Sequence, residues 1–597
     1  MIRKAFPIIL TMILGLWAGD VITHAITASI AAGATPDETI NAVTAALAHP
    51  TGIGLDRDSL LGGIAGMFLV GVAWLYKWSM RRNYRDGEEF GSARWARPEE
   101  MAPYTDRDRR QNLQMTASEG LSLDTMATRR NLNTIVIGGS GSGKTSGYVL
   151  PNIANASMDY VCTDPKGELH DRCARRLADA GYEIHKLDLI DLTTSTTFNP
   201  LKYIDPDKAD VAIMRLVGNI IDNTNNPEAR NGGDQFWEKS EKSLLTALIG
   251  YIYYTADDKH RNLAGVLDLT DDLEASEEDE TRMSEMDIKI QAARELVREW
   301  EASPDDWDEE TGRTARGLKF VVSQYTPFSK GAGETKKSII ISIGVRLAPL
   351  QVVNVRKILE TDNIGIDHIG ETGRRTAIFL ALPDEDRTFN FIAAIFYQCL
   401  FDNVIKRTRG MDGQALPTPL HCFLDEFANV GRIPNFDTLV STIRSRNISV
   451  SVILQTMAQL KAMYEKQWET IIGNCDSILF LGGNEQTTTE WISKQLGKAT
   501  IDMRDTSQSK GASGSFTISN RRTGRELMTP DELAQMDNAK CVYMLRGVHP
   551  FLSDKIRPGA TPRAAGRSTL KHSKGWRPRR PLPRKTDGKD KHGKASE

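Results

Sequence analysis

The chain contains few cysteines and carries almost no net charge. Its six cysteines lie far apart, without a C-x-x-C pair or a cluster of cysteines with histidines (Cys162, Cys173, Cys399, Cys422, Cys475 and Cys541). This spacing suggests neither a zinc site nor a disulfide framework, and scattered thiols fit a reducing compartment. The net charge of −3 means that the protein as a whole is not a polycation. Any contact with nucleic acid must therefore come from local patches.

Charge is also scarce in two stretches near the N-terminus, and these predict a membrane anchor. The first span covers about residues 5–32, with one interruption at Asp20, and the second covers about residues 59–78. Residues 59–76 carry no charge at all. As a helix this uncharged run would be about 27 Å long, which is close to the thickness of the hydrocarbon layer of a bilayer.

Basic residues outside the two spans predict the orientation of the anchor. Arg3 and Lys4 precede the first span, and an arginine cluster follows the second (Arg81, Arg82 and Arg85). The loop between the spans is mainly acidic, so we expect both termini in the cytoplasm. Two alternatives remain open: the first segment is a cleaved signal peptide, or the second is a buried core helix. Gly62-x-x-x-Gly66 could be a helix-packing surface, although this spacing is common by chance.

Residues 138–145 read G-G-S-G-S-G-K-T and match the phosphate-binding pattern G-x-x-x-x-G-K-[ST]. A β-branched run at 134–137 precedes the pattern, and we expect a helix to start near Lys144. The backbone N–H groups of the loop and the positive end of the helix would then hold the phosphates of ATP. Lys144 would add a charge to these phosphates, and the Thr145 hydroxyl would reach Mg²⁺. The alternative is a glycine- and serine-rich turn that binds nothing.

The predicted nucleotide-binding residues are Gly138, Gly139, Ser140, Gly141, Ser142, Gly143, Lys144, Thr145 and Ser146.

Alternating strands and helices predict a parallel α/β sheet around this loop. After the strand at 134–137 we expect strands near 160–163, 184–189, 376–383, 420–424, 449–454 and 477–481, and a further N-terminal strand at 121–123. Helices between the first strands indicate a parallel sheet with crossover helices. The polar residues 164–168 directly follow a strand, so they should lie at the ligand-binding edge of the sheet.

Two carboxylates end the apolar strand before residue 425. Asp425 is suited to hold Mg²⁺ together with Thr145, and Glu426 can orient and polarise the attacking water. A pair of acids at the start of a loop is common in isolation, which is the alternative interpretation. Its occurrence on a separate apolar strand after a phosphate-binding loop favours catalysis.

Three further polar residues are catalytic candidates. Gln455 ends the strand at 449–454, where it could contact the γ-phosphate or the attacking water. Arg444 and Arg446 precede this strand and could reach the nucleotide of a neighbouring subunit; such an arginine raises the rate by about 10³–10⁵. The sequence does not choose between the two arginines, and each could equally be an ordinary surface residue.

Residues 207–345 differ from the α/β part because they show helical periodicity and few strands. They include acidic segments at 271–285 and 305–310, which are most simply a solvated surface and alternatively a docking surface for a basic partner. The last residues, 557–597, contain thirteen Lys/Arg and three Asp/Glu and too little apolar surface to fold. This basic tail could bind nucleic acid or anionic lipid, or simply be solvated.

Several motifs resemble the TraG-type coupling ATPases of type IV secretion and conjugation, and the resemblance covers nearly the whole chain. The most specific are TDPKGEL (163–169) and FLDEFANVGRIP (423–434). Others are FNPL (198–201), DQFWEKSE (234–241), SIIISIGVRLAPL (338–350), TIRSRNISVSVILQ (442–455) and IIGNCDSILFLGG (471–483). The C-terminal motifs ELMTPDEL (526–533) and LRGVHPFLSDK (545–555) resemble members from Gram-positive mobile elements.

This resemblance implies a homo-hexamer at the cytoplasmic membrane with a RecA-like motor domain that hydrolyses ATP with Mg²⁺. Such proteins receive a complex of a relaxase with single-stranded DNA and pass it to the channel proteins of a type IV secretion system. The acidic segment 271–310 and the basic tail match no pattern of the family. Two alternatives remain: an FtsK-like pump for double-stranded DNA, and a docking receptor of the secretion machine that does not hydrolyse its nucleotide.

Together these observations predict an α/β protein with four parts. A two-helix transmembrane anchor occupies residues 1–82, so the protein would be a multi-pass membrane protein with most of the chain in the cytoplasm. A RecA-like nucleotide-binding domain consists of residues 83–206 and 346–556. An all-α domain, residues 207–345, is inserted into it, and the disordered tail begins at residue 557.

Overall fold

A computed structural model gives the structure of the protein. It describes residues 2–48, 52–80, 85–224, 235–279, 282–508 and 516–557. The chain forms two compact units: residues 1–92 with 499–525, and residues 93–498 with those from 526 onward. The predicted basic tail lies outside the described residues except for Arg557, as do Arg81 and Arg82.

A nine-stranded sheet forms the centre of the larger unit, in the order β13-β12-β9-β3-β8-β7-β4-β6-β5. The strands are β3 (Thr134–Ile137), β4 (Asp159–Asp164), β5 (Tyr182–Asp188), β6 (Arg375–Ala381), β7 (Leu420–Leu424), β8 (Ile448–Leu454), β9 (Ser477–Phe480), β12 (Lys540–Leu545) and β13 (Phe551–Asp554). All neighbours from β9 to β5 run parallel. The seven strands predicted from residue 134 onward are therefore confirmed as one parallel sheet.

Two short strands close one edge of this sheet. β12 pairs antiparallel with β9, and β13 pairs antiparallel with β12. The sequence analysis does not predict either strand. A separate antiparallel pair, β1 (Asn112–Gln114) with β2 (Gly120–Ser122), accounts for the N-terminal strand expected at 121–123.

The inner strands β3, β4, β7 and β8 are buried along their whole length, and because successive side chains point to opposite sides of the sheet, both of their faces are covered. In β3, Ile135 and Ile137 belong to one hydrophobic cluster, and Val136 belongs to the other. The same alternation occurs in β7, where Cys422 and Phe423 face opposite clusters. Burial on both faces explains why these strands read as continuous apolar runs.

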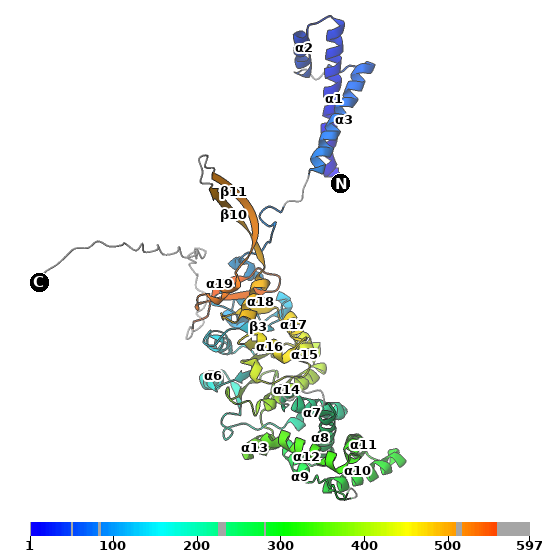
Figure 1. Cartoon of the computed structure of the whole chain (residues 1–597), viewed down its shortest axis with the longest axis vertical. Helices are drawn as coiled ribbons and strands as arrows, with labels where there is room; N and C mark the ends of the chain where they lie inside the picture. Colours follow the sequence, from blue (N-terminus) through cyan, green and yellow to red (C-terminus); the bar gives the residue numbers. More distant parts are fainter. Residues whose placement is uncertain are drawn as a thin grey trace, which may run out of the picture. The chain divides into compact units, whose positions relative to one another are not determined.

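Helices occupy the chain between β5 and β6 as far as the structure describes it. They are α7 (Ala209–Thr224), α8 (Gln235–Thr255), α9 (Leu263–Asp271), α10 (Glu285–Ala302), α11 (Glu309–Ser329), α12 (Gly333–Leu347) and α13 (Val353–Glu360). Figure 1 shows them in teal and green, gathered beyond α14 and away from β3. Their apolar side chains join the same hydrophobic cluster as one face of the sheet.

The other helices of the larger unit connect or flank the strands. They are α4 (Thr125–Thr128), α5 (Leu150–Ile153), α6 (Glu168–Asp179), α14 (Asn390–Arg409), α15 (Phe436–Thr442), α16 (Met457–Tyr464), α17 (Trp468–Gly473), α18 (Gln486–Leu496) and α19 (Pro530–Ala534). Helix α6 ends before Gly181, whose φ of 84° provides the left-handed residue expected at a helix end.

The smaller unit contains α1 (Ile2–Ala31), α2 (Pro36–Ala48) and α3 (Arg57–Ser79). Residues 7–31 and 57–79 form two helices that are long and apolar enough to cross a membrane. The two helices pack closely: a β-carbon on Gly62 would lie 1.9 Å from Thr23 Oγ1, and one on Gly66 would lie 2.3 Å from the Gly15 carbonyl oxygen. The possible packing surface at Gly62 and Gly66 is thus used within the chain, and α2 occupies the loop between the spans.

A two-stranded ribbon completes the smaller unit. It consists of β10 (Lys498–Gln508) and β11 (Phe516–Glu526), paired with each other. Arg522 in β11 forms ion pairs with Glu89 in the segment after α3 and with Asp502 in β10. The sequence prediction does not include this ribbon, although residues 499–504 and 516–519 alternate between apolar and polar side chains.

Candidate functional site

Three adjacent parallel strands bring the predicted nucleotide-binding and catalytic residues together. β8 lies between β3 and β7, with Ile137 opposite Leu454 and Leu424 opposite Val452. The phosphate-binding loop follows β3, Asp425 and Glu426 follow β7, and Gln455 follows β8. Parallel strands that end at the same edge create the crevice where α/β proteins bind ligands.

The loop of residues 138–145 has the backbone shape that its glycines permit. Gly141 and Gly143 have φ values of 73° and 90°, which a residue with a β-carbon adopts only under strain. A β-carbon on Gly138 would lie 2.3 Å from Ser142 Oγ. Ser140 and Gly141 at the tip are exposed, and Gly139 donates its N–H to the Gly482 carbonyl at 2.9 Å.

Lys144 is buried and lies inside this loop. Its Nζ donates to the carbonyl oxygens of Gly138 at 2.9 Å and Gly139 at 3.3 Å. Burial lowers the pKa of Lys144, and the carboxylates of Asp425 and Glu426 act in the opposite direction. The amine therefore lies in a partly desolvated position in the field of the two acids, where a phosphate would provide further negative charge.

The helix expected near Lys144 is present in a modified form. Thr145–Val149 form a single π-type turn, and α5 continues it with Pro151 near its start. Ser146 lies half-buried in this turn. A short helix interrupted in this way still directs its first N–H groups at the loop.

Thr145 and Asp425 form the candidate magnesium position. The Thr145 hydroxyl donates to Asp425 Oδ2 at 2.7 Å, and the Asp425 carboxyl is 1 % exposed. Burial raises the pKa of Asp425 to about 6. A hydroxyl and one carboxylate fit Mg²⁺, which takes oxygen ligands and usually binds through one or two carboxylates together with phosphate and water.

Glu426 has a constrained backbone and two amide partners. Its φ of 47° lies in the left-handed region, which costs a non-glycine residue roughly 1–3 kcal/mol. Gln455 Nε2 donates to Oε1 at 3.2 Å, and Asn429 Nδ2 donates to Oε2 at 3.2 Å. The carboxylate is thus held beside Asp425 by donors from two neighbouring segments. Asn429 was not predicted, although the FLDEFAN motif contains it.

Arg444 and Arg446 lie at the opposite edge of the sheet from the phosphate-binding loop. They precede β8, whose seven residues span about 20 Å, whereas Gln455 follows it. Arg446 donates to the buried Thr408 hydroxyl at 2.8 Å, and its Nε is buried. Among the described residues, the Arg444 guanidinium donates one long hydrogen bond, to the Thr125 carbonyl oxygen at 3.4 Å. Neither arginine is therefore brought to the nucleotide site of its own chain.

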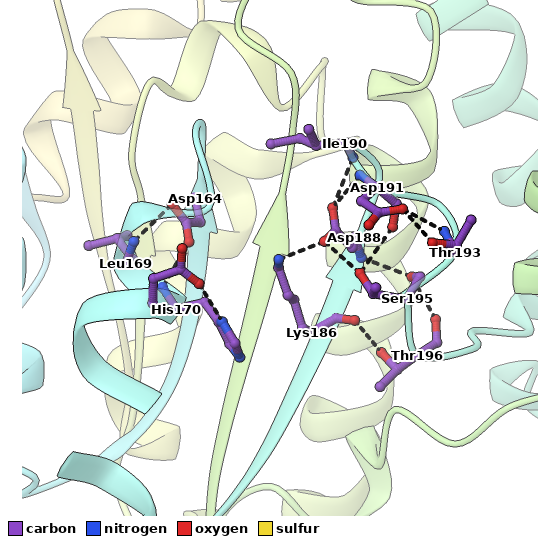
Figure 2. A network of polar contacts seen from close by, with 12 residues as sticks. Asp164, Leu169, His170, Lys186, Asp188, Ile190, Asp191, Thr193, Ser195 and Thr196 are labelled. Atoms are coloured by element: carbon purple, nitrogen blue, oxygen red, sulfur yellow. Dashed lines mark hydrogen bonds and ion pairs between the residues drawn. The ribbon is translucent and has the colours of Figure 1, made fainter. Parts of the chain in front are cut away.

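Polar loops follow the next strands along the same edge, at β4 and β5. Asp164 accepts the N–H groups of Leu169 at 3.1 Å and His170 at 2.9 Å, which caps the start of α6. Lys186 Nζ lies 2.6 Å from a carboxyl oxygen of the buried Asp188. Figure 2 shows these two groups on either side of the strand β6, which separates β4 from β5, and Asp188 also accepts hydrogen bonds from the turn that follows it. The two hydrogen bonds to Asp164 hold the turn of the TDPKGEL segment between β4 and α6.

One residue near the loop was not predicted at all. Lys555, directly after β13, donates to the Ser142 carbonyl oxygen at 2.8 Å. Its position in the sequence is remote from the loop, and no local pattern signals the contact.

A family model described as "Type IV secretory system Conjugative DNA transfer" matches residues 94–557. The chain is 24 % identical to the conjugal transfer protein TraG of Rhizobium radiobacter over 423 residues, which cover 70 % of this chain and 60 % of that protein. It is 20 % identical to protein VirD4 of Rhizobium rhizogenes, with coverage of 79 % and 66 %. The chain thus spans about three fifths to two thirds of these relatives.

Solved structures of the plasmid coupling protein TrwB have a similar fold. The form in complex with a non-hydrolysable ATP analogue gives a TM-score of 0.52 at 14 % identity, covering 79 % of this chain and 97 % of that one. A form in complex with ADP and Mg²⁺ gives 0.51 at 15 % identity, with coverage of 80 % and 98 %. This likeness confirms the predicted RecA-like α/β fold with an all-α part.

Proposed function

Because the chain belongs to the type IV secretory system conjugative DNA transfer family, we propose that it is an ATPase that powers DNA transfer through a secretion channel. In this proposal it recruits a complex of a relaxase with single-stranded DNA and couples ATP hydrolysis to its movement. The observation that carries the proposal is the meeting of the phosphate-binding loop with Asp425 and Glu426 at one sheet edge.

The residues at this edge have separate roles in the proposed reaction. The loop N–H groups and Lys144 bind the β- and γ-phosphates, and Thr145 and Asp425 hold Mg²⁺ when it is bound. Glu426 orients the attacking water, and Gln455 fixes the Glu426 carboxylate through their hydrogen bond. TrwB has been solved with ADP and Mg²⁺ and with an ATP analogue, which supports the same ligands here.

A ring of subunits would complete the site. The location of Arg444 at the far edge of the sheet supports a role at a neighbouring subunit's nucleotide, and its long hydrogen bond to the Thr125 carbonyl leaves it available for one. Arg446 is held by Thr408 and is better explained as a packing residue. We propose a homo-hexamer with DNA in its centre, gripped through its phosphates and therefore sensitive to salt.

The two apolar helices of the smaller unit would anchor this motor in the membrane. Their length, their composition and the close packing of α1 on α3 support two spans. With basic residues at the outer ends and an acidic loop between, both termini and the motor would be cytoplasmic.

The decisive test replaces the loop lysine. Lys144→Ala should abolish ATPase activity and DNA transfer but leave membrane insertion intact, because the anchor is a separate unit. The control is Lys494→Ala, an exposed lysine on α18, which should behave as the unaltered chain. Normal DNA transfer by the Lys144→Ala protein would refute the proposal.

A second measurement separates the motor from a docking receptor. We expect the ATPase rate of the full chain in detergent micelles to rise when single-stranded DNA is added. DNA binding without any turnover would favour a receptor in which the nucleotide is only structural. Stimulation by double-stranded DNA alone would favour a double-stranded DNA pump.

The helices between β5 and β6 are proposed to select the substrate. Exchange of residues 207–345 with the same segment of a relative should change which relaxase–DNA complex is transferred. Unchanged specificity in a chimera that retains its ATPase activity would contradict this role.

A further inference from the structure

Lys555 contacts the phosphate-binding loop from outside the crevice. Its Nζ donates to the Ser142 carbonyl oxygen at 2.8 Å and to Asn538 Oδ1 at 3.1 Å. The Lys555 backbone N–H donates to the Ala539 carbonyl at 2.8 Å, so the base of the side chain is fixed as well as its tip. The segment directly after β13 thereby holds the peptide between Ser142 and Gly143 in the loop.

The next residue supports the same contact. The Ile556 carbonyl oxygen lies 3.2 Å from the position that a β-carbon on Gly147 would occupy. Gly147 belongs to the turn directly after Lys144. Lys555 therefore contacts the loop just before Lys144 in the sequence, and Ile556 lies against the turn just after it.

The charge of Lys555 is not neutralised by its direct partners. Its two acceptors are a backbone carbonyl and an amide oxygen, and both are neutral. Burial lowers the pKa of Lys555, and the side chain is half-buried. The Asp537 carboxylate acts on this amine and favours its charged form, and a phosphate bound in the loop would add to that effect.

The Ser142 carbonyl and the Gly143 N–H belong to one peptide unit. In loops of this kind the N–H groups point at the phosphates. A cation on the carbonyl end polarises the peptide and strengthens its N–H as a donor, as in other chains of hydrogen bonds. It also restrains the peptide from rotating, and the φ of 90° at Gly143 is a conformation from which a free loop could relax.

We propose that Lys555 is a positioning residue for the nucleotide phosphates: it holds and polarises the Ser142–Gly143 peptide so that its N–H faces them. This inference rests on the proposed nucleotide-binding function of the loop. It assigns to the C-terminal motif LRGVHPFLSDK a part in nucleotide binding, although the motif lies far from the loop in sequence.

A nearby lysine provides a matched control. Lys540 is on β12, and its Nζ lies 2.7 Å from the Asp554 carboxylate on the neighbouring strand β13. The pair is exposed to solvent, and loss of such a pair typically has a small effect. Lys540→Gln thus removes the same charge from the same sheet edge without removing a contact to the loop.

The experiment compares Lys555→Gln, Lys555→Arg and Lys540→Gln in the full chain in detergent micelles. The measurements are the dissociation constant of a fluorescent ATP analogue, KM and kcat for ATP, and the melting temperature. Lys555→Gln should weaken ATP binding and raise KM about tenfold, the order expected for loss of one charge-assisted contact, while kcat changes less than about twofold. Lys555→Arg should restore most of the affinity, because a guanidinium can donate to the same carbonyl.

Two outcomes would overturn the inference. One is an ATP affinity of Lys555→Gln equal to that of Lys540→Gln. The other is a parallel loss of kcat, affinity and melting temperature, which would show a merely structural role. The binding measurement does not require ATP hydrolysis. If the unaltered chain binds ATP but does not hydrolyse it, the proposed motor function is contradicted while the role of Lys555 is still tested. If the unaltered chain binds no nucleotide, both the motor function and the role of Lys555 are overturned.

Discussion

Burial of a single carboxyl group determines how the site responds to pH. Asp425 is almost completely buried, and this raises its pKa to about 6. The folded protein therefore binds the Asp425 proton more tightly than the unfolded chain does. Without nucleotide, the contribution of this group to stability is largest below about pH 4 and is lost as the pH rises through about 6. Mg²⁺ requires the opposite, ionised form.

We predict that Mg²⁺-dependent nucleotide binding weakens below about pH 6, because protons and Mg²⁺ compete for Asp425. The measurement is the affinity for a fluorescent ATP analogue with saturating Mg²⁺ between pH 5 and 8. Asp425→Asn should bind weakly at every pH in this range and lose this dependence. An unaltered chain whose affinity is flat across the range would contradict the assignment of Asp425.

Glu426 should separate binding from hydrolysis. Glu426→Gln keeps the size of the side chain but cannot act as a general base, so we expect nucleotide binding to persist while kcat falls about 10²–10⁴-fold. Rapid-quench measurement of ATP cleavage, together with the binding assay, tests this. Asn429→Ala, which removes one of the two donors to Glu426, should have a smaller effect on kcat. Full activity of Glu426→Gln would exclude the proposed role.

An ion pair and a neighbouring hydrogen bond connect three of the helices between β5 and β6. Arg346 on α12 lies 2.6 Å from Glu241 on α8, with side chains 11 % and 6 % exposed. Arg346 also donates to the Thr224 hydroxyl on α7 at 2.8 Å. Arg346 and Glu241 belong to motifs that the sequence analysis identified only by their resemblance to a family. Their ion pair gives these two motifs a physical role.

We predict that Arg346→Met destabilises the protein by about 3–5 kcal/mol, because Glu241 remains buried without its cation. Denaturant unfolding of the full chain in detergent measures the change. The control is Arg356→Met, which removes the exposed pair with Asp268 and should cost less than about 1 kcal/mol. The double replacement of Arg346→Met with Glu241→Met should recover part of the lost stability. Equal losses of stability for Arg346→Met and Arg356→Met would contradict the argument.

The packing of α1 on α3 gives a further prediction. Gly62→Leu should separate these helices, whereas Gly71→Leu should not, because a β-carbon on Gly71 approaches only the flexible end of Met12. Trp74 donates to Thr11 across this contact at 3.1 Å, so a Thr11→Cys, Trp74→Cys pair treated with a bifunctional thiol crosslinker reports it. Its crosslinking yield should fall with Gly62→Leu alone, and the six native cysteines are buried and should not interfere. An unchanged yield would refute this packing.

The sequence predicts the strands that are buried on both faces and the elements whose ends carry clear stop signals such as glycine. It misses the contacts and strands that depend on partners far away in the sequence. The strands β3, β7 and β8 are apolar and β-branched, so their burial is visible in their composition. β12 is as long as the predicted strands, but it pairs antiparallel with β9, and β13 pairs antiparallel with β12. Both therefore lie outside the alternation of strand and helix on which the prediction rests. The candidate residues Lys144, Asp425, Glu426 and Gln455 follow strand ends and were predicted, whereas Lys555 and the inward contact of Arg446 depend on residues far away in sequence.

For the whole molecule, the location of Arg444 predicts cooperation between subunits. Chains with Arg444→Ala and chains with Lys144→Ala should each be inactive alone. In a mixed ring, some sites combine an intact loop with an intact arginine from the next subunit, so part of the ATPase activity should return. The same mixture with Arg446→Ala serves as the comparison, and complementation there instead would reassign the trans residue. No recovery with Arg444→Ala would indicate that it acts within its own chain or not at all.

The strand that carries the phosphate-binding loop has both its neighbours, β8 and β9, in the last third of the chain. During synthesis the apolar N-terminal helices therefore leave the ribosome long before β3 can enter a sheet. Long-range strand pairing of this kind forms late in folding. If α1 and α3 span the membrane as proposed, a polypeptide released early by the ribosome would lie in the bilayer without a complete nucleotide-binding site, and we expect it to hydrolyse no ATP.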